Sequence, residues 1–408
     1  MVAVVGGGAA GMMAAIVAAK NGHKVQLFEK NEKLGKKVYI TGKGRCNITN
    51  AADLEQIFAN VVTNRKFLYS AFYGFDNQQT IQFFEELGVR TKIERGERVF
   101  PVSDKSSDVI QGMQRELNRL GVKLSLQTEV VGIKQTDGQV EGVLLADGKF
   151  VSAGAVIVAT GGLSYPSTGS TGDGYRFAKD MGHTVTKLSP SLVPFQIKEE
   201  FVREMQGLSL KNVALKLYAG KKKIYDDFGE MLFTHFGVSG PLILSASSFV
   251  SKYIDKQEIT LVLDLKPALS SEQLDARIVR DFSEMQNKQF KNGLDKLLPK
   301  KMIPVVLSLS EIDPNKPIHS VTKEERQRIV ELLKGMELHL ERLRGYNEAI
   351  ITKGGVSVKE INPGTMESNL VKGVYFVGEV LDLDALTGGY NLQIAWSTAY
   401  AAGSQVEE

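Results

Sequence analysis

The glycine pattern Gly6-x-Gly8-x-x-Gly11 near the start of the chain constrains the fold more than any other feature. It lies between the apolar stretch Val2 to Val5, typical of a buried strand, and the small-residue stretch Ala9 to Asn21, typical of a helix. In that setting the first glycine permits a tight turn, the second lets the backbone approach a pyrophosphate, and the third lets the helix pack close to the strand. The pattern therefore predicts a phosphate-binding turn at a helix N-terminus.

The next strand, Lys24 to Glu29, completes a β-α-β unit and ends in a carboxylate. A carboxylate about twenty residues after the glycines accepts hydrogen bonds from ribose hydroxyls, which favours a dinucleotide without a 2′-phosphate. The alternative is a glycine-rich turn that only packs, and the strand, the helix and the terminal acid together disfavour it. The uncharged stretch Val2 to Ala19 approaches the length of a membrane span, but it contains the glycine turn and lacks a positive leader. We therefore expect a soluble, cytoplasmic protein.

Composition narrows the class of protein. The chain has 408 residues, of which 43% are hydrophobic and 24% charged, enough for two or three domains with their own cores. A formal net charge of +3 gives no reason to expect an anionic membrane or a nucleic acid as the main partner. The lone cysteine, Cys46, excludes a disulfide relay, and no clustered ligand spacing indicates a metal site. The oligomeric state is left open.

A second motif is the basic segment Lys36 to Thr49, whose glycines at positions 42 and 44 expose backbone N–H groups. Side-chain donors for an anion or a polar ring edge come from Lys43, Arg45, Asn47 and Thr49. On composition, a solvated surface loop and a cofactor or substrate loop are equally good interpretations. Cys46 is either a reactive thiol or a small packing residue.

A third motif lies near the C-terminus, where Gly378-Glu379 and Asp382 precede the run Gly388 to Gln393 at the start of a helix. A glycine turn at a helix N-terminus is again an anion site, and a reduced flavin carries negative charge at its N1/O2 edge. The strand Val374 to Val377 and the helix Asn391 to Ala402 cannot bury themselves alone, so we place them in the first domain, which is then discontinuous. Two glycine turns in one such domain suggest a single extended ligand. The alternative is a helix that closes the domain and begins at glycine.

Five segments together carry a resemblance to a known family: Gly6 to Gly11 (GGGAAG), Thr41 to Asn50 (TGKGRCNITN), Ala159 to Gly174 (ATGGLSYPSTGSTGDG), Phe233 to Pro241 (FTHFGVSGP) and Gly378 to Ala399 (GEVLDLDALTGGYNLQIAWSTA). Over nearly its whole length the chain resembles the HI0933-like (YhiN/BaiN-type) family of NAD(P)/FAD-dependent oxidoreductases. The resemblance implies an α/β fold: a glutathione-reductase-like, Rossmann-type FAD-binding domain with an inserted β-barrel-like module and a helical module. The implied boundaries are 1–189 and 353–408 for the FAD-binding domain, 190–268 and 336–352 for the barrel-like module, and 269–335 for the helical module.

The resemblance also implies where FAD lies. Its pyrophosphate would meet the first glycine turn, its adenosine ribose Glu29, its adenine the backbone of Val130, and its isoalloxazine the C-terminal motif. The basic segment would follow the flavin, and Thr160 to Gly162 the ribityl and pyrophosphate stretch. The full set of expected cofactor-binding residues is Gly6, Gly8, Ala9, Ala10, Gly11, Glu29, Lys30, Lys37, Val38, Thr41, Gly42, Gly44, Arg45, Cys46, Asn47, Val130, Thr160, Gly161, Gly162, Gly378, Glu379, Asp382, Gly389, Tyr390, Asn391, Leu392 and Gln393.

Three residues are candidates for catalysis. His235 would overhang the flavin if the inserted module caps the site, and histidine changes its charge near neutral pH, so it could carry the proton that accompanies hydride transfer. A satisfied structural histidine is the alternative. Tyr390 is a second candidate proton donor, and Arg45 a clamp for a carboxylate or enolate oxygen.

We therefore expect an FAD-dependent oxidoreductase that reduces an activated C=C bond in a small organic substrate. A second GxGxxG pattern for NAD(P)H is missing from the sequence, so NAD(P)H would bind transiently at the flavin face, or a different donor would serve. One alternative is a flavoenzyme acting on RNA. Its sole sequence support is Lys221 to Lys223, and a run of three lysines at a hairpin tip is more often just a soluble edge. Another is a flavin-binding sensor or regulator without turnover.

Overall fold

The computed structural model describes residues 1–407, which divide into two compact units. The first unit contains residues 1–191 and the chain from residue 346 onward. The second unit is Leu192–Gly345. The observed insertion is thus somewhat shorter at both ends than the predicted one, 190–352.

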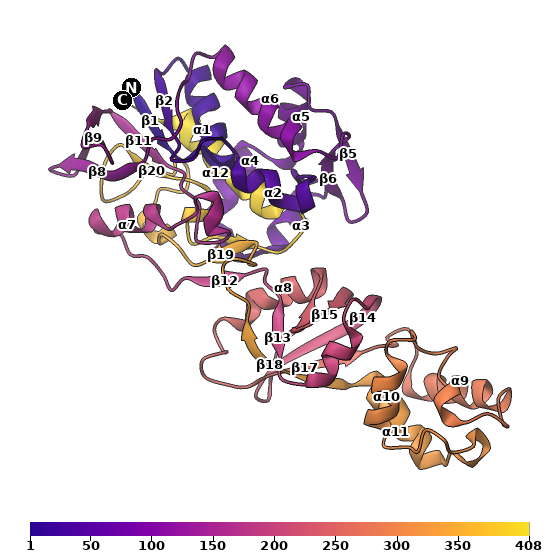
Figure 1. Cartoon of the computed structure of the whole chain (residues 1–408). Coiled ribbons are helices and arrows are strands. Elements are labelled where there is room, and N and C mark those ends of the chain that lie inside the picture. Colours follow the sequence, from indigo (N-terminus) through magenta and orange to yellow (C-terminus); the bar gives the residue numbers. More distant parts are fainter. Residues whose placement is uncertain (408) are drawn as a thin grey trace. The chain divides into compact units, whose positions relative to one another are not determined.

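The first unit is built on a five-stranded parallel sheet with the strand order β20-β11-β1-β2-β7 (Figure 1). Four of the five strands are buried at every position, as expected for a parallel sheet covered on both faces. This arrangement confirms the predicted β-α-β unit and the Rossmann-type fold. The strands are β1 (Val2–Val5), β2 (Val25–Phe28), β7 (Lys123–Ser125), β11 (Ala155–Val158) and β20 (Val374–Phe376).

The position of β7 corrects one expectation. In the sequence, Lys123 to Thr128 is the first of several short strands separated by the turn signals Asp137-Gly138 and Asp147-Gly148, which predicts a series of hairpins. In the structure, however, β7 lies parallel to β2, with Gln26 opposite Lys123. The reason is the preceding helix α6 (Ser106–Arg119), because a helical crossover returns the chain parallel to its earlier strand. The antiparallel hairpin sheet begins one strand later and comprises β8 (Val130–Thr136), β9 (Gln139–Leu145) and β10 (Phe150–Ser152).

Two helices of small residues, α1 (Ala9–Lys20) and α12 (Tyr390–Gln405), pack against each other. Gly403 makes the contact possible, since a Cβ there would lie 2.8 Å from the carbonyl oxygen of Ala14. The C-terminal segment is thereby held beside the first glycine turn. The other elements of this unit are α2 (Lys36–Ile40), β3 (Thr49–Asn50), α3 (Leu54–Ala59), β4 (Val61–Thr63), α4 (Tyr69–Gly74), α5 (Asn77–Glu86), β5 (Thr91–Glu94), β6 (Arg98–Pro101), α7 (Asp173–Asp180), β12 (Ser189–Ser191), β19 (Ile351–Lys353) and β21 (Asp384–Ala385).

The second unit has its own hydrophobic core inside and beside a closed six-stranded barrel with the order β13-β16-β15-β14-β17-β18. Its strands are β13 (Phe195–Ile197), β14 (Ser209–Ala219), β15 (Lys222–Phe233), β16 (Gly237–Ser239), β17 (Ile259–Asp264) and β18 (Met336–Leu343). Four helices belong to the same unit: α8 (Pro241–Val250), α9 (Ser271–Ser283), α10 (Ile303–Ser310) and α11 (Lys323–Lys334). The expected barrel-like and helical parts are both present. Within residues 1–407, no helix is long and apolar enough to cross a bilayer.

Candidate functional site

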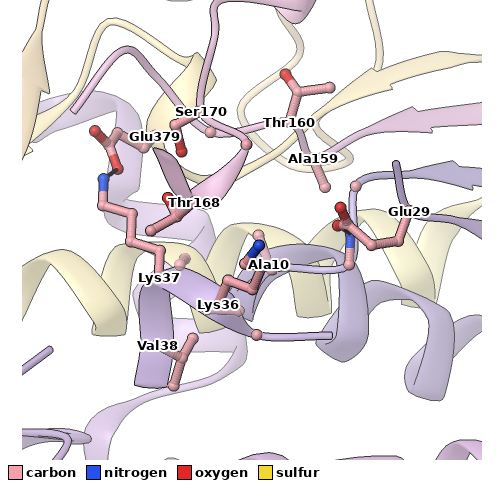
Figure 2. A pocket seen from close by; sticks show the side chains of 18 of the residues that line it. Ala10, Glu29, Lys36, Lys37, Val38, Ala159, Thr160, Thr168, Ser170 and Glu379 are labelled. Carbon is pink, nitrogen blue, oxygen red and sulfur yellow. Dashed lines mark hydrogen bonds and ion pairs between the residues drawn. The ribbon is translucent and has the colours of Figure 1, made fainter. Parts of the chain in front are cut away.

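A cavity in the first unit runs from the first glycine turn to the N-terminus of α12 (Figure 2). Fifteen of the residues expected to bind the cofactor line it: Gly6, Gly8, Ala9, Ala10, Glu29, Lys30, Lys37, Val38, Thr41, Val130, Thr160, Gly161, Glu379, Asn391 and Leu392. Twelve others are not part of its wall: Gly11, Gly42, Gly44, Arg45, Cys46, Asn47, Gly162, Gly378, Asp382, Gly389, Tyr390 and Gln393. The first glycine turn and the first residues of α12, which lie far apart in the sequence, thus line one cavity, whereas Gly388 and Gly389 of the C-terminal turn do not.

The glycines of the first turn have separate roles. A Cβ at Gly11 would lie 1.8 Å from the carbonyl oxygen of Gly6, so only glycine allows α1 to approach β1 this closely. A Cβ at Gly8 would meet no atom of residues 1–407 within 4 Å, and Gly8 borders the cavity. Gly8 therefore leaves open space where a pyrophosphate would approach the N-terminus of α1.

Glu29 is buried at the end of β2 and fastens the turn. Its Oε2 accepts a hydrogen bond from the backbone N–H of Gly7 at 2.7 Å. Its Oε1 accepts from the backbone N–H of Asn31 at 2.8 Å and from the Asn31 side-chain amide at 2.7 Å. The carboxylate therefore lies in the cavity wall with its orientation fixed by three donors.

Glu379 connects four segments at another part of the wall. Its Oε2 accepts from Lys37 Nζ at 2.6 Å, and its Oε1 accepts from Ser164 Oγ at 2.9 Å and from the backbone N–H of Thr352 at 2.8 Å. Figure 2 shows the side chains of Lys37 and Glu379 directed toward each other. Both side chains are only 20% exposed, so little solvent screens the pair.

The loop before α7 forms a side of the cavity that we did not expect from the residues alone. Thr168, Gly169, Ser170 and Asp173 line it, and Lys30 Nζ lies 2.6 Å from Asp173 Oδ2. Burial acts to raise the pKa of Asp173, but the hydrogen bond and charge of Lys30 hold it below its ordinary value. The signal for this loop was present in the glycine-rich run from Ala159 to Gly174.

Sequence reasoning missed other wall residues as well. Asn31 and Lys36 lie in the polar segment after β2, whereas Phe177, Ile350, Ile351, Val377, Leu383, Ile394 and Ala395 are apolar. The apolar residues carry no local signal, because any core position in a strand or helix has the same character.

The basic segment divides after Thr41. Its first part lines the cavity through Lys36, Lys37, Val38 and Thr41, whereas none of the residues from Gly42 to Thr49 is part of the wall. The guanidinium of Arg45 pairs with Glu94 and Asp104, which raises the pKa of Arg45, and it lies 4.2 Å from the centre of the Phe100 ring. Cys46 is fully buried, which raises the pKa of its thiol to about 12. At neutral pH this thiol is protonated and enclosed, as expected of a packing residue.

The C-terminal motif combines wall residues with residues that brace them. Asn391 lines the cavity, and its side-chain amide donates to the backbone carbonyl of Ala385 at 2.8 Å. Gln393 is buried and accepts a hydrogen bond from Thr49 Oγ1 at 2.6 Å. Tyr390 is buried beside them, and burial raises the pKa of its hydroxyl. Asp382 Oδ2 accepts from the Asn64 side-chain amide at 3.2 Å.

His235 lies in the second unit, in the exposed turn between β15 and β16. Its ring packs edge-on against the ring of Phe236, with 4.9 Å between the two ring centres. The guanidinium carbon of Arg344 lies 4.5 Å from the centre of the same phenyl ring. The role of His235 as a proton carrier stays a prediction.

FAD fits the first-unit cavity on two observations. The buried hydroxyl Oγ1 of Thr160, a wall residue, has no hydrogen-bond partner within residues 1–407, and the same holds for Asn47 Oδ1 in the basic segment. Buried polar atoms are almost always paired, so an unpaired hydroxyl in a cavity wall indicates a polar ligand. The open space at Gly8 leaves room for a phosphate at a helix N-terminus, as a dinucleotide requires.

The fold and the cavity define a Rossmann-type FAD-binding oxidoreductase. The family model described as "HI0933-like protein Rossmann domain" matches residues 1–405, and the chain belongs to that family. It is 33% identical to a 3-dehydro-bile acid delta(4,6)-reductase of Clostridium scindens, covering 100% of this chain and 99% of the relative. It is also 33% identical to a ribosomal RNA dihydrouridine synthase of Haemophilus influenzae, and this match covers 99% of this chain and 97% of the relative.

A solved structure supports the fold. The 3-ketosteroid delta1-dehydrogenase of Sterolibacterium denitrificans matches with a TM-score of 0.52 at 13% identity, over 98% of both chains. At that identity the likeness concerns the fold alone.

Proposed function

We propose that this protein uses FAD to reduce a C=C bond conjugated to a carbonyl group in a small organic substrate, with NAD(P)H as a transient electron donor. The observation that carries the proposal is the single cavity joining Gly8, Glu29, Thr160 and Glu379, which suits one extended dinucleotide. The names of the two 33%-identical relatives support the reaction type, since a delta(4,6)-reductase of a 3-oxo compound and a dihydrouridine synthase both saturate a C=C bond in conjugation with a carbonyl.

The residues of this chain would bind and orient the cofactor. Gly8 and the first N–H groups of α1 would hold the pyrophosphate, and Glu29 would accept from the adenosine ribose. Thr160 would donate its unpaired hydroxyl to the ribityl or pyrophosphate stretch. Lys37, held by Glu379, would place a positive charge at the wall of the cavity. The bound flavin supplies hydride transfer, so the protein contributes position, charge and a proton donor.

Anaerobic reduction tests the donor and the reaction together. Purified protein should hold FAD and not FMN, and its visible absorbance should bleach with NADH or NADPH. Adding a conjugated enone or enoate should restore the oxidised spectrum and saturate the C=C bond, with one hydride from the flavin and one proton from solvent or protein. A saturated analogue that lacks the double bond is the control and should leave the reduced spectrum unchanged.

Reduction of uridine in ribosomal RNA is a second candidate function. Two rRNA dihydrouridine synthases align with this chain over 99% of its length, that of Haemophilus influenzae at 33% and that of Escherichia coli at 29% identity. The two candidates separate in one assay: reduced protein is offered unmodified ribosomal RNA or a small enone, and the reoxidation rates are compared. Reoxidation by RNA alone, with salt-sensitive RNA binding, would replace the small-molecule proposal. If NADH and NADPH do not bleach the flavin, and neither RNA nor the enone reoxidises the reduced protein, a flavin-binding regulator is favoured.

A further inference from the structure

A second cavity lies wholly within the second unit, apart from the cavity proposed to hold FAD. Its volume is about 480 Å³, within the range of about 300 to 1,000 Å³ that is usual for small-molecule sites. Its walls come from β14, β15, α9 and the loops that follow β17 and precede α10. All its lining residues lie between Leu210 and Met302, so the second unit supplies the whole site.

An irregularity in β14 helps to form this cavity. The register between β14 and β15 shifts between Leu210 and Val213, which pair with Met231 and Gly229 respectively. Lys211 and Asn212 are thereby left out of the ladder, and both line the cavity. A bulge of this kind bends the strand and redirects its side chains, and bulges are frequent beside functional sites.

The charged lining residues are all cations. Lys211, Lys266 and Arg277 line the cavity, and its lining within residues 1–407 includes no aspartate or glutamate. Lys266 Nζ already donates to the backbone carbonyl of Leu297 at 2.5 Å, which leaves further N–H donors on the ammonium group. Burial, and then the charge of Arg277, lowers the pKa of Lys266. A bound anion would relieve this repulsion between two neighbouring cations.

Arg277 carries an unsatisfied donor. Its Nε is buried and has no hydrogen-bond partner within residues 1–407. On the same helix, Asp281 Oδ2 lies 3.5 Å from Arg277 Nε. This oxygen is likewise without a hydrogen bond among the described residues. A terminal nitrogen of the guanidinium donates to the backbone carbonyl of Lys296 at 3.2 Å. The side chain is 41% exposed, so the remaining terminal N–H donors, rather than the buried Nε, can meet a ligand.

Apolar side chains make up most of the remaining wall. Leu265, Leu298 and Met302 are buried behind it, and the ring of Phe228 is 53% exposed at its side. A phosphate or another fully hydrated anion gains nothing from such walls, whereas a ligand with an apolar body buries area against them.

We propose that this cavity is a second ligand site of the protein and that it binds an apolar carboxylic acid free in solution. The carboxylate lies between Lys266 and Arg277, and the apolar body lies against Leu298, Met302 and Phe228. The site is independent of the FAD proposal, because no residue of the first unit lines it.

Calorimetric titration of the FAD-loaded protein with decanoate tests this site. Decanoate should bind once per chain and at least about tenfold more tightly than decanol, which has the same apolar body without the charge. Lys266→Met and Arg277→Met should each weaken decanoate about tenfold and leave decanol unchanged. Phe228→Ala should weaken both ligands. Because Phe228 is exposed, this variant tests the site even if the charge variants fold poorly.

Val279→Ala is the matched control, since Val279 lies on α9 two residues after Arg277, is 44% exposed and does not line the cavity. It should bind both ligands like the unaltered protein. Equal affinity for decanol and decanoate, or decanoate binding that the Lys266, Arg277 and Phe228 variants leave unchanged, would overturn the proposal. Because FAD content and enone reduction are measured on the same samples, failure of the proposed function would be seen separately.

Discussion

Lys37 Nζ lies 2.6 Å from Glu379 Oε2, although 342 positions separate the two residues in the chain. The pair joins α2 to the segment that follows β20, and through Ser164 and Thr352 it also reaches the loop after β11 and strand β19. Four segments of the discontinuous unit are therefore held together by one carboxylate at the wall of the cavity.

A double-mutant cycle should measure this relationship. In Lys37→Met, the Glu379 carboxylate keeps only its two neutral donors, Ser164 and Thr352. In Glu379→Gln, the Lys37 ammonium group keeps only its hydrogen bond to Ser164. Each change should therefore lower the free energy of unfolding by about 1 to 3 kcal/mol. The double variant should lose clearly less than the sum of the two. Urea unfolding of the FAD-free protein gives the coupling energy, and strictly additive losses would mean that the two groups do not interact in solution.

Much of this unit follows from local sequence rules. The β-α-β unit, the close packing that Gly11 allows, and the position of Glu29 after the second strand depend on neighbouring residues, and the structure has each where the pattern predicts. The contacts of Gly8 and Glu29 with a cofactor stay predictions. The pairing of β7 with β2 was not predicted, because a three-residue strand does not reveal its partner. The Lys37 to Glu379 contact depends on chain closure over hundreds of residues, which no local pattern encodes.

The basic segment shows a different limit of sequence reasoning. Its donors fit an anion site equally well whether the anion is a ligand or part of the protein. In the structure Arg45 forms ion pairs with Glu94, the last residue of β5, and with Asp104, which follows β6. Arg45 does not line the cavity. Only the tertiary packing decides between these partners.

Substitutions at Gly8 and Gly11 should separate binding from folding. Gly8 has φ −81°, which alanine also adopts, and its Cβ would point into open space, so Gly8→Ala should fold with a loss of about 1 kcal/mol or less. Its added methyl group should nevertheless obstruct the pyrophosphate and lower FAD content. Gly11→Ala should lose about 3 kcal/mol or more, because its Cβ collides with Gly6. Thermal unfolding and the flavin absorbance of the purified proteins distinguish the two, and full FAD content in Gly8→Ala would contradict the assigned turn.

Thr160→Val should affect the free and the FAD-bound protein in opposite directions. Removing a buried hydroxyl that lacks a partner should leave the FAD-free protein as stable as before or more stable by about 1 kcal/mol. FAD affinity should fall about tenfold, because the ligand loses a hydrogen bond. The control is Thr168→Val, whose hydroxyl already donates to the carbonyl of Tyr165 at 2.7 Å, so its removal should destabilise the FAD-free protein. Unchanged FAD affinity in Thr160→Val would remove Thr160 from the site.

The ion pair of Lys30 with Asp173 predicts a loss of FAD in acid. Since the pKa of Asp173 lies below its ordinary value of 3.8, its stabilising contribution is complete above that pH and disappears as the pH falls through the lowered pKa. FAD release measured by fluorescence should therefore steepen below about pH 4. Asp173→Asn should release FAD more readily at neutral pH and show a shallower dependence in acid. An unchanged acid profile would show that other carboxylates govern release.

Proton delivery is tested with His235 and a matched histidine of the same unit. A general acid contributes about 100-fold or more to a rate, so His235→Gln should slow enone reduction by about that factor while FAD content stays unchanged. His319→Gln is the control and should leave the rate unaltered, since His319 is also exposed and its Nδ1 donates one hydrogen bond to the backbone carbonyl of Gln286. If His235→Gln turns over at the normal rate, Tyr390→Phe becomes the decisive variant. Burial raises the pKa of Tyr390, so its hydroxyl remains protonated and able to donate throughout the neutral range.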